Sequence, residues 1–299
     1  MTKAQPPEIG DILRQCPPAG PILIAGPTAS GKSALALALA EASGGLVLNA
    51  DAIQVYSDWR ILTARPSEKD ETRAPHALYG HVPGDHAYSV GQWLRDIGPF
   101  LQHERPIIVG GTGLYFTALT EGLAQIPEIP AQWREESAQF LAERGLAAMR
   151  DDLDTETAQK IDTANPMRVQ RAWEVLKSTG KGLARWHAET PPPLLPLKAC
   201  HAIVLDSPKE WLSPRIEHRF RTMIDGGALD EARSNQAAWR PDQPSAKAIG
   251  AAELMAHLDG EMSLDQVVAR ASILTRQFAK RQRTWFRARM KAWQQITLA

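Results

Sequence analysis

The sequence predicts an α/β fold in which a parallel sheet is interrupted by an all-helical insertion. Short apolar segments typical of buried strands alternate with helical segments over residues 21–119, and another follows at residues 201–206. Parallel strands require such crossover helices, which cover both faces of the sheet. Between these regions, residues 131–189 show only helical periodicity. A chain of 299 residues is long enough for two domains of ordinary size.

The first half of the chain divides into elements in regular order. Residues 1–20 are rich in proline and polar groups, which predicts a flexible N-terminal tail. Ser89 is a predicted helix cap. In chain order we predict a strand at residues 21–25, a helix at 32–42, a strand at 46–51, a long loop at 64–88, a helix at 89–104, a strand at 106–109 and a helix at 113–119.

The pattern changes after residue 126, and this change predicts the domain boundaries. Residues 21–126 form the first part of the α/β core, and residues 127–190 form the helical insertion. Three prolines at residues 191–193 break the helical pattern. Residues 191–299 then return to the core with a further strand and C-terminal helices. We expect the insertion to fold as a unit of its own.

Composition excludes several classes of protein. The hydrophobic fraction of 43% and the charged fraction of 23% are ordinary for a globular protein. No apolar run reaches the ~18 residues needed to cross a bilayer, and the N-terminus lacks the apolar segment of a signal peptide. Cys16 and Cys200 are the only cysteines, which is too few for a disulfide framework and suits a reducing cytoplasm.

The net charge of zero conceals a basic segment. Residues 266–299 contain eight basic residues and no acidic one. Such a block predicts either a solvated helix face or a surface for a local anionic partner, such as phosphates or RNA. Trp285, Phe286 and Trp293 interleave with these charges, either as core anchors or as stacking platforms.

The strongest local motif is a phosphate-binding loop. It fits G-x-x-x-x-G-K-[ST], follows a predicted strand and opens a predicted helix, so the core is predicted to be P-loop NTPase-like. Backbone N–H groups and the helix N-terminus of such a loop surround phosphate oxygens. Lys32 adds a full positive charge, and Ser33 can hold Mg²⁺. The loop consists of Gly26, Pro27, Thr28, Ala29, Ser30, Gly31, Lys32 and Ser33.

Polar residues end two other predicted strands. An ordinary P-loop NTPase has a magnesium-binding acid after an apolar strand, but residues 106–109 are followed by Gly110-Gly111-Thr112. The strand that ends in an acid is residues 46–51. Because ligands bind at the carboxyl ends of parallel strands, we expect Asp51 and Thr112 to converge near the phosphate loop. Three roles remain open for Asp51: a displaced magnesium ligand, a general base and a cap.

A site that binds phosphates without the usual acid suggests that the phosphate is a leaving group. Diphosphate would then depart with its charge neutralised by Lys32, Mg²⁺ and arginines, and the new bond would form to carbon. The alternative interpretation is a small-molecule kinase or a nucleotide-binding switch that holds ATP in the same loop.

Several blocks together resemble the tRNA dimethylallyltransferase family. The phosphate loop is shared with many NTPases, but the blocks at residues 51–56, 110–115 and 275–286 are far more specific. Further similar residues are Arg168, Arg171 and the segment 215–219. The resemblance covers residues 21–287 in family order.

The resemblance implies transfer of a dimethylallyl group from dimethylallyl diphosphate to N6 of an adenosine beside the tRNA anticodon. It implies Asp51 as the general base and Thr112 as a hydrogen-bond partner of the departing diphosphate. Gln54 would help to recognise the adenine, which must flip out of its stack to reach an enclosed site. The diphosphate would be held by Thr28, Ala29, Ser30, Gly31, Lys32, Ser33, Arg215 and Arg219, with Mg²⁺ near Ser33.

The resemblance also implies that the helical insertion binds the anticodon stem-loop. A transferase that used free AMP as its acceptor would not need such an insertion, so the insertion argues against that alternative. Nothing in the sequence demands a dimer, so a monomer is expected. The chain departs from the family pattern at Ala52, where Ser is usual, and at Ala251, where Tyr is usual. The implied tRNA-binding residues are Asp51, Ala52, Ile53, Gln54, Thr112, Arg134, Met167, Arg168, Val169, Gln170, Arg171 and Lys247.

Overall fold

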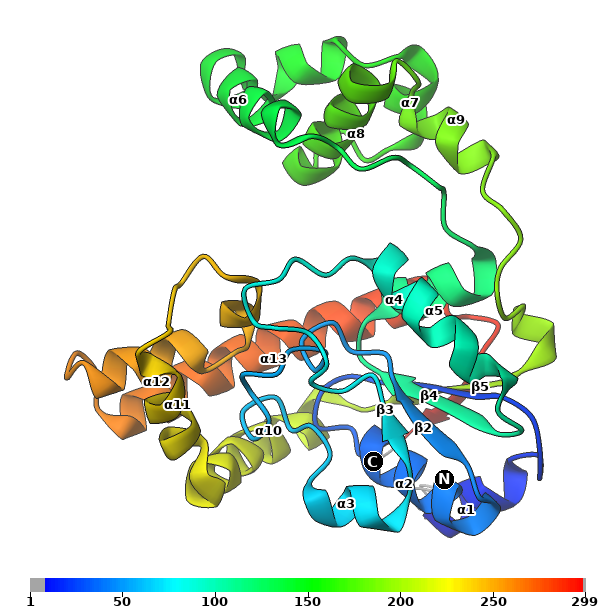
Figure 1. The fold of residues 1–299 in the computed structure, drawn as a ribbon, viewed down its shortest axis with the longest axis vertical. Coiled ribbons are helices and arrows are strands. Elements are labelled where there is room, and N and C mark those ends of the chain that lie inside the picture. The colour runs from blue at the N-terminus through cyan, green and yellow to red at the C-terminus, as the bar shows by residue number, and fades with distance from the viewer. Residues whose placement is uncertain (1–8, 298–299) are drawn as a thin grey trace. The chain divides into compact units, whose positions relative to one another are not determined.

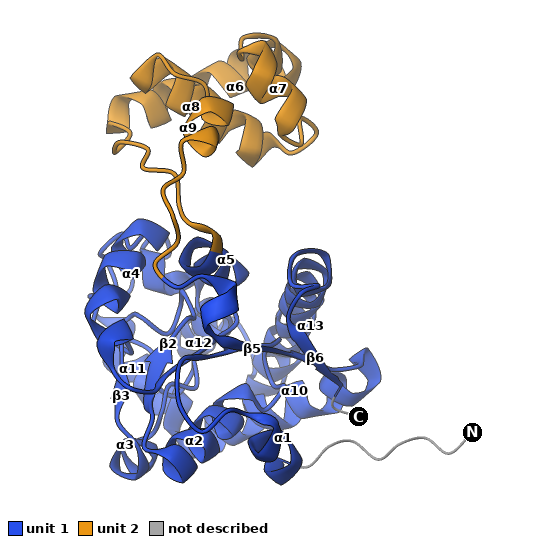
Figure 2. Ribbon diagram, turned by 90° about the vertical axis from the view of Figure 1, so that its right-hand side faces the viewer, with its two compact units in different colours: residues 1–120, 195–299 blue, residues 121–194 orange. Residues whose placement is uncertain are grey.

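The computed structural model describes residues 9–297, which fold into two compact units (Figures 1 and 2). The first unit comprises residues 1–120 and 195–299, and the second comprises residues 121–194. The chain therefore leaves the first unit once and returns to it once. The helical residues 127–190 lie within the second unit.

The first unit is built on a parallel sheet, to which residues 9–297 contribute six strands. These are β1 (Ile22–Ala25), β2 (Leu46–Asn49), β3 (His76–Ala77), β4 (Pro106–Gly110), β5 (His201–Asp206) and β6 (Gln294–Thr297). Their order is β3-β2-β4-β1-β5-β6, and every neighbouring pair is parallel. β1 and β4 are buried along their whole length, which explains their unbroken apolar sequences. The α/β class is confirmed.

Helices cover both faces of the sheet and form a further layer beside it (Figure 1). They are α1 (Ile9–Gln15), α2 (Lys32–Ser43), α3 (Glu68–Arg73), α4 (Val90–Ile97), α5 (Gly113–Glu121), α10 (Lys209–Met223), α11 (Leu229–Gln236), α12 (Ala251–Leu258) and α13 (Leu264–Arg289). One core cluster contains Trp93, Phe116, Phe286 and Trp293. Of the aromatic residues in the basic segment, Phe286 and Trp293 are thus core anchors, and Trp285 packs partly buried against the same cluster.

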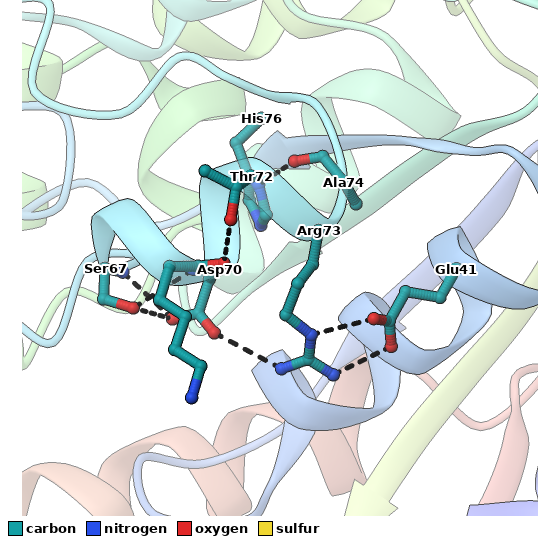
Figure 3. Close-up of polar contacts among 8 residues, drawn as sticks. Glu41, Ser67, Asp70, Thr72, Arg73, Ala74 and His76 are labelled. Atoms are coloured by element: carbon teal, nitrogen blue, oxygen red, sulfur yellow. Dashed lines mark hydrogen bonds and ion pairs between the residues drawn. The ribbon is translucent and has the colours of Figure 1, made fainter.

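Residues 64–88 contain α3 and β3, so the prediction of one long loop is wrong there. A capping box begins α3: Ser67 Oγ accepts from the Asp70 N–H at 3.2 Å, and Asp70 Oδ2 accepts from the Ser67 N–H at 3.0 Å. Arg73 then donates two 2.8 Å hydrogen bonds to Glu41 on α2 (Figure 3). The capping signal is present in the sequence, but the surrounding proline, histidine and glycine favour a loop.

Two elements lie where the sequence predicts none. Residues 9–15 of the predicted tail form α1, whose Ile12 is buried in the same cluster as Leu35 of α2. The tail prediction is wrong for this helix, and its remainder over residues 1–8 lies outside the described residues. β6 has the sequence Gln-Gln-Ile-Thr, which carries no apolar alternation, and it forms by pairing with β5.

The second unit is helical throughout its regular structure. It contains α6 (Ala131–Asp151), α7 (Thr155–Lys160), α8 (Pro166–Thr179) and α9 (Leu183–Ala188). α6 bends at Gly145, where φ is 78° and ψ is 171°. Trp173 of α8 contacts Trp133 and Phe140 of α6 and forms part of the core of this unit. Across residues 9–297, no helix is both long and apolar enough to span a membrane.

Candidate functional site

The phosphate loop joins β1 to α2 at the carboxyl edge of the sheet. Its backbone is left-handed at Ala29, with φ 62°, and at Gly31, with φ 87°. Gly31 is the N-cap of α2 and has no side chain to occupy the first helical N–H groups, which remain free for a ligand. The Ser30 side chain is only 1% exposed and packs toward Gly26. Of the predicted loop contacts, Ser30 can therefore offer its backbone rather than its hydroxyl.

Three basic side chains surround the loop. Lys32 Nζ donates to the Pro27 carbonyl at 3.3 Å. Arg219 Nη1 donates to Thr28 Oγ1 at 3.2 Å, and Arg215 Nε donates to the Ala29 carbonyl at 3.4 Å. Burial lowers the pKa of Lys32 to about 8; nearby Asp51 opposes this change and Arg219 adds to it. An anion bound beside Lys32 would favour its charged form.

Asp51 and Thr112 meet beside the loop, as the strand-end rule predicts. The Thr112 N–H donates to the Ala50 carbonyl at 3.2 Å, and Thr112 Oγ1 accepts from the Ala52 N–H at 2.9 Å. Asp51 Oδ1 accepts from the Ile53 N–H at 3.1 Å, which fixes the carboxylate in a tight turn. A hydroxyl that accepts one hydrogen bond keeps its own hydrogen for a second partner.

Gln282 joins the two halves of this site. From α13, its Oε1 accepts from the Thr28 N–H at 2.9 Å, and its Nε2 donates to the Gly111 carbonyl at 3.0 Å. Any side chain at position 111 would collide with this amide, because a Cβ there would lie 2.2 Å from Gln282 Nε2. The sequence places Gln282 in a specific block but gives no hint of this bridge. The one feature of the sequence that points to this residue is a glutamine among the basic residues of the C-terminal helix.

A cavity of about 360 Å³ in the first unit is lined by part of the predicted site, whereas Thr112 and Ala52 lie outside its lining. Lys32, Asp51 and Arg219 line its charged end, with Gln54 next to Asp51 and the exposed Lys247 at its margin. The rest of its lining is largely apolar, which the sequence does not reveal because five separate segments supply it. The apolar residues are Ile53, Leu62, Ile216, Phe220, Met223, Ile249 and Phe278.

A second cavity, of about 1010 Å³, adjoins the first at the phosphate loop. Ser30, Gly31 and Arg215 line this larger space, whereas Lys32 and Arg219 line both cavities. Lys32 and Arg219 therefore lie where the two cavities meet. The larger cavity is rich in basic residues, and the smaller one, which we call the chamber, contains Asp51.

Comparisons with known proteins decide the family. A model described as IPP transferase matches residues 54–289, and one described as isopentenyl transferase matches residues 21–75. The tRNA dimethylallyltransferase of Dinoroseobacter shibae is 61% identical over 276 residues, which cover 91% of this chain and 93% of that relative. The chain belongs to the tRNA dimethylallyltransferase family. The resemblance seen in the sequence is confirmed, and the protein is a prenyltransferase rather than a kinase.

Other relatives agree with this assignment. The tRNA dimethylallyltransferase of a Ruegeria species is 60% identical over 93% of this chain and 95% of its own length. The tRNA isopentenylpyrophosphate transferase of Bacillus halodurans superposes with a TM-score of 0.64 at 30% identity, covering 93% of this chain and 90% of that one. A eukaryotic dimethylallyltransferase acting on tRNA gives a TM-score of 0.74 at 26% identity, over 89% and 69% respectively.

The helical unit of this family member presents some of the predicted tRNA-binding residues and hides others. Arg134, Met167, Arg168 and Arg171 are exposed. Val169 is fully buried against Met149 and Trp173, so its side chain cannot reach RNA, and its predicted role is limited to the backbone. Gln170 is half-buried and donates to Ser137 Oγ at 2.8 Å.

Proposed function

We propose that this chain transfers the dimethylallyl group of dimethylallyl diphosphate to N6 of the adenosine beside the anticodon of tRNA and releases diphosphate. The observation that carries this proposal is the shared chamber of the phosphate loop, a carboxylate and an apolar wall. An apolar wall beside a phosphate loop suits a ligand that carries an apolar group on its phosphates. An allylic diphosphate presents both chemistries in one molecule.

The diphosphate is the leaving group in this reaction. The bond between the allylic carbon and the bridging oxygen breaks, and its electron pair departs with the diphosphate. Lys32, Arg219 and the loop N–H groups neutralise the charge that develops there. The Thr112 hydroxyl, which accepts from Ala52, donates its own hydrogen toward the departing oxygen. Fixed donors of this kind stabilise the transition state without reorganising during the reaction.

Asp51 accepts the proton that N6 loses as it bonds to carbon. Its Oδ1 is held by the Ile53 N–H, and its Oδ2 faces Gly111, where a Cβ would lie only 3.1 Å away. Glycine at that position keeps the carboxylate uncovered. A carboxylate held at one oxygen and open at the other suits a general base.

The oxygen donors of the site fit a magnesium ion that arrives with the diphosphate. Among residues 9–297, no three His, Cys, Asp or Glu side chains cluster as a metal site. Mg²⁺ commonly takes one or two protein oxygens and completes its shell with phosphate and water. Ser33 lines the same cavity as the loop, and its hydroxyl would hold the ion. When bound, the ion would help to neutralise the diphosphate.

Two basic surfaces support tRNA as the acceptor. In the first unit, a groove between α10 and α13 is lined by Lys209, Arg276, Lys280, Arg283 and Arg287. In the helical unit, the exposed arginines at positions 134, 168 and 171 provide a second one. Electrostatic contacts of this kind dominate the affinity for nucleic acids. We also place this activity in the cytoplasm, as the presence of only two cysteines suggests, and in a monomer, since nothing in the sequence demands a dimer.

Incubation with dimethylallyl diphosphate and unmodified tRNA, followed by mass analysis of anticodon-loop nucleosides, tests the proposal. We expect one adenosine to gain a dimethylallyl group at N6. Unchanged nucleosides, or modification at a position other than N6, would overturn it. Free AMP in place of tRNA is the matched control and should remain unmodified.

A further inference from the structure

A loop on one wall of both cavities is held by a carboxylate far away in the sequence. Glu231, in the first turn of α11, accepts hydrogen bonds from three consecutive backbone N–H groups. Its Oε1 accepts from Arg60 at 2.5 Å and from Ile61 at 2.9 Å, and its Oε2 accepts from Leu62 at 2.9 Å. Three backbone donors that converge on one anion fix the orientation of the peptide units that carry them.

The turn that follows these residues depends on such support. Ala64 has a φ of 53°, in the left-handed region that residues other than glycine rarely adopt. The turn closes through the Ala64 N–H to the Ile61 carbonyl and the Arg65 N–H to the Arg60 carbonyl, both at 2.9 Å. Unfavourable backbone conformations persist where the surrounding structure enforces them, and they cluster at functional sites.

The far side of this turn orients Gln54. Gln54 Nε2 donates to the Thr63 carbonyl at 2.9 Å and to the Ala64 carbonyl at 3.0 Å. Because both partners are acceptors, the amide orientation is fixed, and Oε1 is left as the atom that can meet a ligand. Gln54 lines the chamber with Asp51. An acceptor at this place matches an N–H donor, such as the amino group of adenine.

We propose that Glu231 is a positioning residue that sets the acceptor side of the site by clamping residues 60–62 and, through them, Gln54. This inference rests on the proposed function. It concerns a carboxylate outside the lining of the chamber. Two other contacts anchor the same loop: Trp59 is buried, and Asn235 Nδ2 donates to the Asp58 carbonyl at 2.7 Å. A variant that loses only the carboxylate therefore keeps the loop attached and alters its orientation.

Glu231→Gln tests the clamp, since an amide nitrogen would then face a backbone N–H in place of an oxygen. We expect kcat/KM for tRNA to fall on the order of tenfold, the effect of losing a charge-assisted hydrogen bond. The KM for dimethylallyl diphosphate should stay within about twofold, because the phosphate loop is untouched. Asp230→Asn, which alters an exposed neighbour paired with Arg233, is the matched control and should behave as wild type.

Hydrogen exchange gives a readout that does not depend on activity. The amides of residues 60–62 should exchange faster in Glu231→Gln than in the wild type, whereas those of α2 should not change. Unchanged protection at residues 60–62 would overturn the clamp even if the enzyme were inactive on tRNA. Inactivity of the wild-type protein on tRNA would instead overturn the proposed function. The exchange experiment would still show whether Glu231 holds residues 60–62.

A double-mutant cycle with Gln54→Ala separates positioning from a general structural role. If Glu231 acts through Gln54, adding Glu231→Gln to Gln54→Ala lowers kcat/KM for tRNA by less than about twofold more. If the two losses multiply, Glu231 acts elsewhere and the proposal is wrong. Equal rates of Glu231→Gln and wild type would also contradict it.

Discussion

The two sides of the small cavity are built in different ways. The donor side centres on one contiguous loop at the start of α2, to which α10 adds Arg219 and α13 adds Gln282. The acceptor side, with Gln54 and Leu62, is held by residues of α11 that lie about 170 positions away in the chain. The loop of the donor side is therefore specified by consecutive residues, whereas the loop of the acceptor side depends on contacts with a helix that is distant in the chain. The two sides should respond differently to mutation.

The largest expected effect is at Asp51, which lies between the two sides. Asp51→Asn keeps the oxygen that accepts from the Ile53 N–H but removes the base, so turnover should fall on the order of a thousandfold. Donor binding should persist, because the loop and its cations remain. Single-turnover kinetics and calorimetry with dimethylallyl diphosphate measure the two quantities. Near-normal turnover would show that Asp51 is not the base; Asp85→Asn, on the surface, is the control.

Gln282 joins the phosphate loop to Gly111, which precedes Thr112, so its loss should disturb both of these segments. Gln282→Met leaves the Thr28 N–H and the Gly111 carbonyl without their buried partner, which should cost about 2 kcal/mol of unfolding free energy. Donor affinity and tRNA turnover should fall together. Denaturant unfolding measures the first effect and steady-state kinetics the second. Gln102→Met, at an exposed position of the first unit, is the control and should change neither.

The pH dependence of donor binding isolates the donor side. Burial lowers the pKa of Lys32 to about 8, so the positive charge is present below that pH and is lost as the pH rises through it. The Kd for dimethylallyl diphosphate should be about tenfold weaker at pH 9 than at pH 7. Calorimetry at both pH values measures this change. In Lys32→Met the affinity for dimethylallyl diphosphate should be lower and should not change between pH 7 and pH 9. If the affinity of this variant still changed with pH, a group other than Lys32 would be responsible.

The smallest expected effect concerns tRNA alone. Charge reversal at Arg168 and Arg171 should weaken tRNA binding on the order of fivefold at moderate salt and flatten its salt dependence. Donor binding should not change, since both residues lie in the helical unit. Filter binding across a salt series provides the measurement. Charge reversal at Arg144 and Arg150 in the same unit is the matched control. An equal loss of tRNA affinity in that variant would show that Arg168 and Arg171 have no specific role in tRNA binding.

The sequence predicts the donor side well because its information is local. Eight consecutive residues specify the loop, and the rule that ligands bind at strand ends brings Asp51 and Thr112 to it. Gln282 and Glu231 could not be predicted in the same way. The Thr28 contact of Gln282 spans 254 positions, and no periodicity connects a helix residue to a backbone group at that separation.

The errors in the fold have equally physical causes. β6 has a mostly polar sequence and becomes a strand only by pairing with β5. α3 has a capping signal in its sequence, but the turn-forming residues on both sides of it led to the prediction of a loop. Val169 looks like part of a binding segment in the sequence, yet its position on α8 turns the side chain into the core.

The helical unit is one continuous stretch of chain placed inside the sheet unit. β5 and β6 follow it, so during synthesis the ribosome delivers a complete helical unit while the sheet still lacks two neighbouring strands. β1, and with it the start of the phosphate loop, then has an open edge where β5 will pair. The helical unit can become native first, and until β5 arrives the nascent sheet depends on its own chain or on chaperones to shield that edge.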